Sequence, residues 1–194
     1  MTGDFLITKE FLKELSPCTD GYRWFCETYP DGGKYQEILD RLCELGRFDD
    51  ACWLLDKVGA TDDVLKLTSI DDKERSICFA GDVVVKENLV LKNIKAGRSI
   101  EAGRYIKAGE YIKAGRYIKA GWYIEAGRSI EAGGFIEAGG FIKAGEFIEA
   151  GSDYGVYAGL RVRIYDMKEI GYVKAQEKPE NLMCGYWEGE GYEI

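Results

Sequence analysis

The most regular pattern of hydrophobic and polar positions in the chain runs from residue 94 to residue 151. An isoleucine recurs every six residues, ten times in all, and each is followed by Lys or Glu, then Ala, then Gly. On a helix with this period the isoleucines would be distributed around the axis and would not form one buried face. Each glycine would also lower the stability of the helix by about 1 kcal/mol. In a strand, Ile and Ala share one side and the charged residue points to the other. The pattern therefore predicts short strands joined by turns at glycine, where a positive φ is often needed.

The charged position of each unit indicates how many units make one coil. Opposite charges on neighbouring strands stabilise a sheet, and like charges destabilise it. Stacking residues 18 apart gives five opposite pairs out of seven, whereas a spacing of 24 gives two out of six. The like pairs at spacing 18 are Lys95 with Lys113 and Glu131 with Glu149. We therefore predict a mainly β protein, a parallel β-helix with a triangular coil of about 18 residues, preceded by a small α-helical N-terminal domain.

The segments on either side of the repeat predict domains that cover the open ends of the coil. Helical spacing and capping residues predict helices over 7–15, 21–29, 34–45 and 49–58, with Thr61 capping a last short helix through Leu67. Residues typical of β-strands begin at residue 76. After the repeat, its pattern resumes once at 156–159, and hydrophobic and polar residues alternate over 160–167 as in a strand. The expected organisation is an α-helical N-terminal domain over 1–75, the parallel β-helix over 76–165, and a C-terminal cap over 166–194.

An aromatic or serine side chain precedes most of the isoleucines. At spacing 18, Tyr105, Tyr123 and Phe141 form one column and Tyr117 and Phe135 another, facing outward if strand alternation extends back this far. Two interpretations stay open: the rings stiffen the outside of a narrow coil, or they offer a hydrophobic surface to a partner or a second copy. Under the second, the candidate partner-binding residues are Tyr105, Tyr111, Tyr117, Trp122, Tyr123, Phe135, Phe141 and Phe147.

The composition argues against catalysis. The chain has no histidine, which removes the commonest general acid/base and metal ligand. The serines lack the context of a nucleophile elbow or a phosphate loop. The paired acids Asp49-Asp50, Asp62-Asp63 and Asp71-Asp72 are more simply explained as helix caps or solvated loops. We therefore expect no catalytic residue, no metal site and no cofactor.

Cysteine spacing and the N-terminal sequence indicate the compartment. The six cysteines form no CxxC pair and lie mostly in apolar helical patterns, which is typical of reduced thiols. The chain shows neither a basic segment followed by an apolar run at its N-terminus nor a stretch of 18 apolar residues. These features predict a soluble, cytoplasmic protein, located in the host cytoplasm if a phage encodes it.

The charge is unevenly distributed. The net charge is −8, and residues 1–94 carry 19 acids against 12 bases, whereas the repeat is close to balanced. An acidic first half is repelled by nucleic acid and anionic membranes and attracted to basic proteins. We therefore expect a protein partner, such as a basic subunit of a nucleic-acid-processing complex, and no direct contact with nucleic acid or membrane.

The six-residue period resembles that of the hexapeptide-repeat, left-handed parallel β-helix family. Many members of that family are acyltransferases with a catalytic histidine, so the absence of histidine here removes the implied activity. The small residue also follows the aliphatic one by two positions (Ile, then Ala), whereas the family places it two positions before. The resemblance therefore implies architecture alone and leaves the hand of the coil open.

The segment LGRFDDACWLLDKVGATDDVLKL, preceded by LSPCTDGYRWFCETYP, resembles the helical leader of solenoid proteins from phages and mobile elements. That resemblance implies an accessory protein, and small acidic proteins in such settings are often inhibitors of host defence, anti-CRISPR proteins included. The leading hypothesis is a non-enzymatic protein-binding protein of this kind. The alternatives are a self-assembling structural β-helix, which would be a homo-oligomer, and an enzyme that acts on a small ligand through carboxylates and tyrosines.

Overall fold

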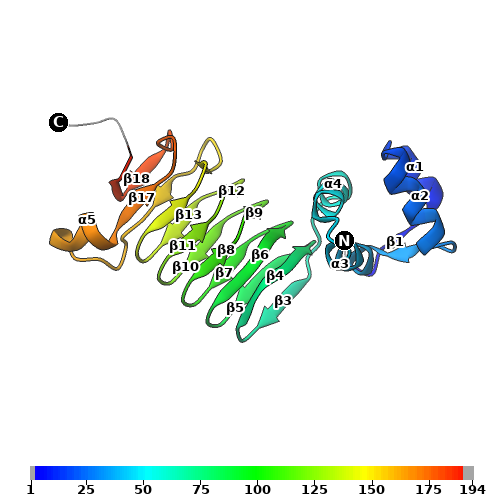
Figure 1. The fold of residues 1–194 in the computed structure, drawn as a ribbon, viewed down its shortest axis with the longest axis horizontal. Coiled ribbons are helices and arrows are strands. Elements are labelled where there is room, and N and C mark those ends of the chain that lie inside the picture. The colour runs from blue at the N-terminus through cyan, green and yellow to red at the C-terminus, as the bar shows by residue number, and fades with distance from the viewer. Residues whose placement is uncertain (1–2, 190–194) are drawn as a thin grey trace.

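Strands stacked into a long solenoid make up most of the computed structural model, which describes residues 3–189, and helices stand at the N-terminal end (Figure 1). The hydrophobic repeat forms the middle of the solenoid. The C-terminal residues up to 189 return to the coil after a short excursion that carries helix α5 (Met167–Ile170). No helix in the described part of the chain is long and apolar enough to cross a membrane.

Four helices precede the coil, where the sequence predicted them. They are α1 (Lys9–Glu14), α2 (Thr19–Thr28), α3 (Tyr35–Glu44) and α4 (Phe48–Val58). Thr8 caps α1 by accepting a hydrogen bond from the Phe11 backbone N–H at 3.2 Å. Gly46 and Gly59 adopt φ of 73° and 94° just beyond α3 and α4, which is the left-handed geometry that stops a helix. A two-stranded antiparallel sheet of β1 (Leu6–Ile7) and β2 (Gly33–Lys34) ties the first helical pair to the second.

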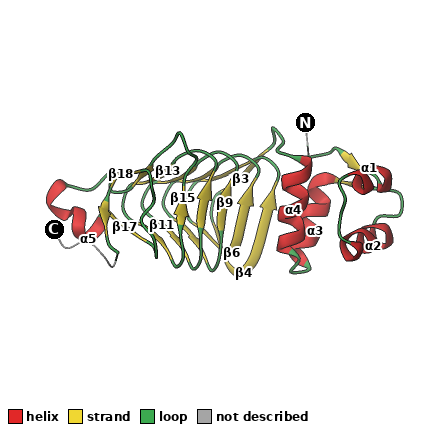
Figure 2. Ribbon diagram, turned by 90° about the horizontal axis from the view of Figure 1, so that it is seen from above, coloured by secondary structure: helices red, strands yellow, loops and turns green. Residues whose placement is uncertain are grey.

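Helices α3 and α4 lie against the N-terminal end of the coil (Figure 2). Their apolar side chains share a core with Cys78 and Ala80, which belong to or follow strand β4 (Ile70–Phe79). The side-chain amide of Gln36 donates to the Cys78 carbonyl at 3.0 Å and accepts from the Ala80 N–H at 2.9 Å. Because the amide replaces a neighbouring strand's hydrogen bonds here, α3 is joined to the coil by polar contacts as well as by packing.

The coil has three faces. One is a parallel seven-stranded sheet, which corresponds to about seven turns, in the order β18-β16-β13-β10-β7-β5-β3. The other two faces are continuous because β6 (Leu89–Ala96) bends around a corner, pairing with β8 through residues 89–91 and with β9 through residues 94–96. The remaining strands are β3 (Val64–Leu67), β5 (Asp82–Val85), β7 (Ile100–Ala102), β8 (Ile106–Ala108), β9 (Ile112–Ala114), β10 (Ile118–Ala120), β11 (Ile124–Ala126), β12 (Ile130–Ala132), β13 (Ile136–Ala138), β14 (Ile142–Ala144), β15 (Ile148–Glu149), β16 (Val156–Tyr157), β17 (Tyr172–Lys174), β18 (Leu182–Cys184) and β19 (Tyr186–Trp187).

Strand register confirms the 18-residue coil. Ile118 of β10 lies beside Ile100 on one side and Ile136 on the other. The same spacing relates β8 to β11 and β9 to β12 on the other two faces. The isoleucines and alanines of the repeat point inward and form one continuous core. Most of these isoleucines, Ile118 among them, have no solvent exposure. The charged residue between each Ile and Ala points outward, as strand alternation requires.

Two predictions about the flanks of the repeat are wrong. The short helix expected from Thr61 to Leu67 is instead β3, which pairs in parallel with β5, because the coil offers a strand partner that outweighs local helix propensity. The strand expected over 160–167 is a loop with a 3₁₀ turn at Ile164–Asp166 that leads into α5. The structure gives that segment no neighbouring strand, and Ile164 is 92% exposed. The coil thus starts at Val64, before the boundary expected at residue 76. Within residues 3–189 its last strand ends at Trp187, beyond the boundary expected at residue 165.

The turn glycines serve a different purpose from the one expected. The glycines with positive φ in the described chain are Gly32, Gly46, Gly59, Gly159 and Gly185, all outside the repeat. Within the repeat, a Cβ on Gly127 would lie 1.9 Å from the Gly109 carbonyl oxygen of the coil below. Glycine is therefore required at such corners because neighbouring backbones approach too closely for a side chain.

Candidate functional site

Aromatic rings stack along two corners of the coil. On one corner the ring centroids of Tyr105 and Tyr123 are 4.8 Å apart, and those of Tyr123 and Phe141 are 4.7 Å apart. On another, Tyr117 and Phe135 stack at 4.8 Å. Both columns are those expected from the 18-residue spacing.

Tyr172 lengthens the first column by one ring. Its ring lies 5.0 Å from that of Phe141, centroid to centroid, and is nearly parallel to it. Tyr172 is not among the eight residues predicted from the sequence. The signal was present, because the sequence Tyr-Val-Lys-Ala at 172–175 repeats the order of an aromatic residue, an aliphatic residue, Lys and Ala found in the repeat.

Stacking determines what these columns present to solvent. The rings lie outside the Ile/Ala core and are partly exposed. Interplanar angles of 2° to 9° mean that each inner ring has both faces covered by its neighbours, so mainly ring edges and hydroxyl groups remain accessible. Such a surface contributes rigidity through cross-strand contact and offers few ring faces to a ligand.

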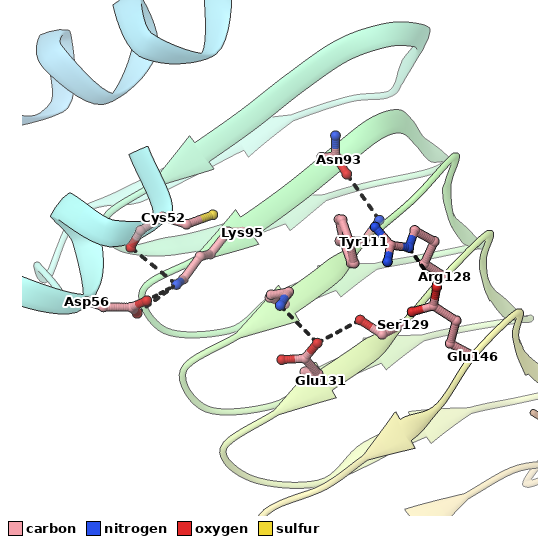
Figure 3. Close-up of polar contacts among 10 residues, drawn as sticks. Cys52, Asp56, Asn93, Lys95, Tyr111, Arg128, Ser129, Glu131 and Glu146 are labelled. Atoms are coloured by element: carbon pink, nitrogen blue, oxygen red, sulfur yellow. Dashed lines mark hydrogen bonds and ion pairs between the residues drawn. The ribbon is translucent and has the colours of Figure 1, made fainter. Parts of the chain in front are cut away.

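The other three predicted aromatics belong to neither of the stacked columns. Tyr111 lies in a column interrupted by the buried Ser129, and its ring is 4.7 Å from the Arg128 guanidinium carbon (Figure 3). The ring centroid of Trp122 lies 4.5 Å from the Arg104 guanidinium carbon. Phe147, at the third corner, is exposed. The eight predicted residues are thus distributed over three corners and do not form one binding surface.

Ion pairs neutralise the charged faces of the coil. Four of the five predicted opposite pairs form, with N···O distances of 2.7 to 3.7 Å: Lys107–Glu125, Lys143–Glu125, Lys113–Glu131 and Lys119–Glu137. In the fifth, Glu101 lies opposite Lys119 in register but accepts a hydrogen bond from Tyr117. That hydrogen bond is the main reason why the pKa of Tyr117 is raised.

One of the two predicted like-charge pairs has a structural explanation. Lys95 lies beside Lys113 in register, but its ammonium group turns to the Asp56 carboxylate of α4, with N···O distances of 2.6 and 2.7 Å (Figure 3). It also donates to the Cys52 carbonyl at 3.4 Å. Lys95, the first charged residue of the repeat, therefore holds the helical domain to the coil.

Thiols gather at the same junction. Burial raises the pKa of the Cys43 thiol to about 12. Cys78 is fully buried, and its thiol interacts with that of Cys52, lowering the pKa of Cys52 and raising that of Cys78. In residues 3–189, no group of three or more Cys, Asp or Glu side chains is arranged to hold a metal ion.

An apolar cleft of about 250 Å³ opens in the helical domain. All four helices contribute to it, and so does the segment between α1 and α2. The lining residues are Leu12, Pro17, Cys18, Gly21, Trp24, Phe25, Ile38, Leu42, Asp49, Asp50, Trp53 and Leu54. Leu12, Phe25, Ile38, Leu42 and Leu54 are buried, so they form the interior of the cleft. Trp24 and Trp53 are half-buried and the Cys18 side chain is exposed, so these three form part of its rim.

Arg47 connects two of the helices beside this cleft. Its guanidinium group pairs with Asp20 of α2 at 2.8 Å and with Asp50 of α4 at 2.6 Å. The same group lies 5.3 Å from the Trp24 ring, within reach of a cation–π contact. These contacts hold α2 and α4 in a fixed relation at an acidic rim. The cleft could not be predicted from the sequence, because its shape depends on how the two helical pairs lie relative to each other.

The helical end of the chain is similar to a known family of domains. Residues 1–61 match the YdhT N-terminal domain. The matched segment contains all four helices and ends just before the first strand of the coil. No curated protein sequence and no solved structure matches the chain.

Proposed function

We propose that the protein is a non-enzymatic protein-binding protein, in which the solenoid is a rigid scaffold and the YdhT-like helical domain makes the specific contact. One observation carries this proposal: an apolar cleft opens in the helical domain, in which acids outnumber bases. Residues 1–61 hold twelve acids against seven bases, whereas the charges along the coil pair with one another. Aromatic anchors in a well-packed pocket with a polar rim are typical of protein interfaces.

The partner that fits this surface is a basic protein. An acidic domain attracts basic surfaces and speeds their association, and subunits of nucleic-acid-processing complexes are a common source of such surfaces. Together with the leader-like N-terminal sequence, this supports the further proposal that the protein acts in a host cytoplasm as an inhibitor encoded by a phage or mobile element, in the manner of an anti-CRISPR protein. In this proposal the protein has no catalytic step and needs no cofactor.

Affinity capture tests the proposal. The full-length chain, immobilised through its C-terminus, should retain a discrete basic protein from host lysate, and rising salt should release it because charge attraction is screened. Recovery of no protein, or of acidic proteins that salt does not release, would contradict the proposal.

Self-assembly is the second candidate. The C-terminal end carries exposed hydrophobic side chains, among them Ile164, Tyr165 and Met183, which is typical of an association surface. The helical domain lies against the opposite end of the coil, so it blocks stacking of coils through that end. This arrangement predicts a closed pair instead of a filament. Light scattering distinguishes the two, because mass that grows without limit as concentration rises would indicate a filament.

A further inference from the structure

The helical cleft is open to solvent but small. Its volume of about 250 Å³ lies below the roughly 300–1,000 Å³ of pockets that enclose drug-sized ligands. It is therefore better matched to a single large side chain than to a whole small molecule. The two tryptophans at its rim are the residue type that most often dominates the energy of protein interfaces.

The charged groups at the rim restrict what can accompany such a side chain. Arg47 already neutralises Asp20 and Asp50 through ion pairs of 2.8 and 2.6 Å. Asp49 is exposed, and within residues 3–189 no hydrogen bond or ion pair engages its carboxylate. A ligand that enters the cleft therefore meets one unneutralised negative charge at the rim, in a domain with a surplus of acids.

We propose that the cleft between the helical pairs binds a basic peptide segment of a partner protein, which inserts one aromatic or large aliphatic side chain and pairs a Lys or Arg with Asp49. This inference rests on the proposed function and specifies the partner's chemistry. The hydrophobic side chain contributes affinity by burial against Trp24, Trp53 and the cleft interior. The basic residue contributes orientation and discrimination against acidic segments.

Cys18 provides a way to block the cleft without changing the core. Its thiol is exposed and lines the cleft, and it accepts a hydrogen bond from the Gly21 N–H at the start of α2 at 3.3 Å. Alkylation with N-ethylmaleimide places a bulky group at the cleft entrance. The Cys18→Ser variant keeps a good N-cap and removes the reactive atom. The variant treated in the same way therefore controls for modification of the other cysteines.

The test selects binders for the full-length protein from a display library of random short peptides. The expected consensus has an aromatic or large aliphatic residue close to Lys or Arg. Alkylation of the wild-type protein should reduce binding of the selected peptides at least tenfold, whereas the alkylated Cys18→Ser variant should bind as the untreated protein does. An acidic consensus, a purely hydrophobic one, or peptides that bind equally well after alkylation would overturn the inference.

Charge neutralisation tests the role of Asp49 separately. Asp49→Asn should weaken the selected peptides by about threefold, the effect expected of an exposed ion pair. Asp31→Asn makes the same change in net charge at an exposed residue outside the cleft and should leave binding unchanged. Equal effects of the two variants would show that only overall charge matters and would overturn the pairing with Asp49. If lysate capture succeeds while the peptide tests fail, the proposed function stands and this inference falls.

Discussion

At the residue scale, the turn glycines show how closely the coils are packed. The Gly127 corner leaves no space for a methyl group, because the carbonyl oxygen of Gly109 occupies the position of a Cβ. At Gly109 the nearest atom to an added Cβ is the Lys92 carbonyl oxygen, 3.5 Å away, which is an ordinary contact. The same position of the repeat is thus crowded in one coil and open in the coil below. From the sequence we expected glycine at each corner because of a positive φ. The structure shows instead that neighbouring backbones approach each other closely there.

This difference gives a matched pair of substitutions. Gly127→Ala should destabilise the protein by about 1–3 kcal/mol, because the backbone must shift to relieve overpacking. Gly109→Ala should be neutral or stabilise by up to about 1 kcal/mol, since alanine loses less backbone entropy on folding. Urea unfolding measures both. Equal losses of stability would contradict the close approach at Gly127.

At the element scale, the strands that could be predicted from the sequence are those within the repeat, because the spacing of its charged residues indicates how the strands pair. Alternating Lys and Glu encode the 18-residue spacing, and the aromatic columns follow from it. Strand β3 was missed because a short apolar segment such as Val64–Leu67 suits either a helix or a strand, and only the neighbouring β5 decides between them. The cleft was missed for a related reason. Trp24 and Trp53 are 29 positions apart in the sequence, and tertiary packing brings them to one cavity.

The longer aromatic column makes the coil sensitive to alkaline pH. Burial raises the pKa of Tyr123 above its ordinary value. The stability linked to this group is therefore fully present below the unfolded-state pKa of about 10 and is lost as pH rises through the higher folded-state pKa. Tyr123→Phe should keep the ring stack, since Phe141 already occupies the next position. We expect the stability of the variant to fall less steeply above pH ~10 in denaturant titrations. A slope equal to that of the wild type would contradict the assignment.

At the scale of the whole molecule, the coil consists of turns that contact only their neighbours, so a whole turn can be removed. Deletion of Ile100–Tyr117 joins Ser99 to Ile118 and removes one 18-residue turn. The deletion replaces the like pair of Lys95 and Lys113 with Lys95 opposite Glu131. We expect a cooperatively folded, shorter protein by circular dichroism and thermal unfolding.

A deletion that is not a whole number of units is the control. Removal of residues 103–117 joins Ala102 directly to Ile118 and leaves no turn between two strands. We expect this variant to misfold or aggregate, because its isoleucines can no longer all face the core. If it folds as well as the variant lacking Ile100–Tyr117, an independent 18-residue turn is not the structural unit.

The most direct test of the division into scaffold and contact domain is capture of the partner by three forms of the chain: wild type, the variant lacking Ile100–Tyr117, and wild type alkylated at Cys18. If the helical domain makes the contact, the shortened coil should bind the captured protein with unchanged affinity and the alkylated chain should bind it at least tenfold more weakly. Loss of binding by the shortened coil, with full binding by the alkylated chain, would place the contact on the solenoid and contradict the assignment of the helical cleft.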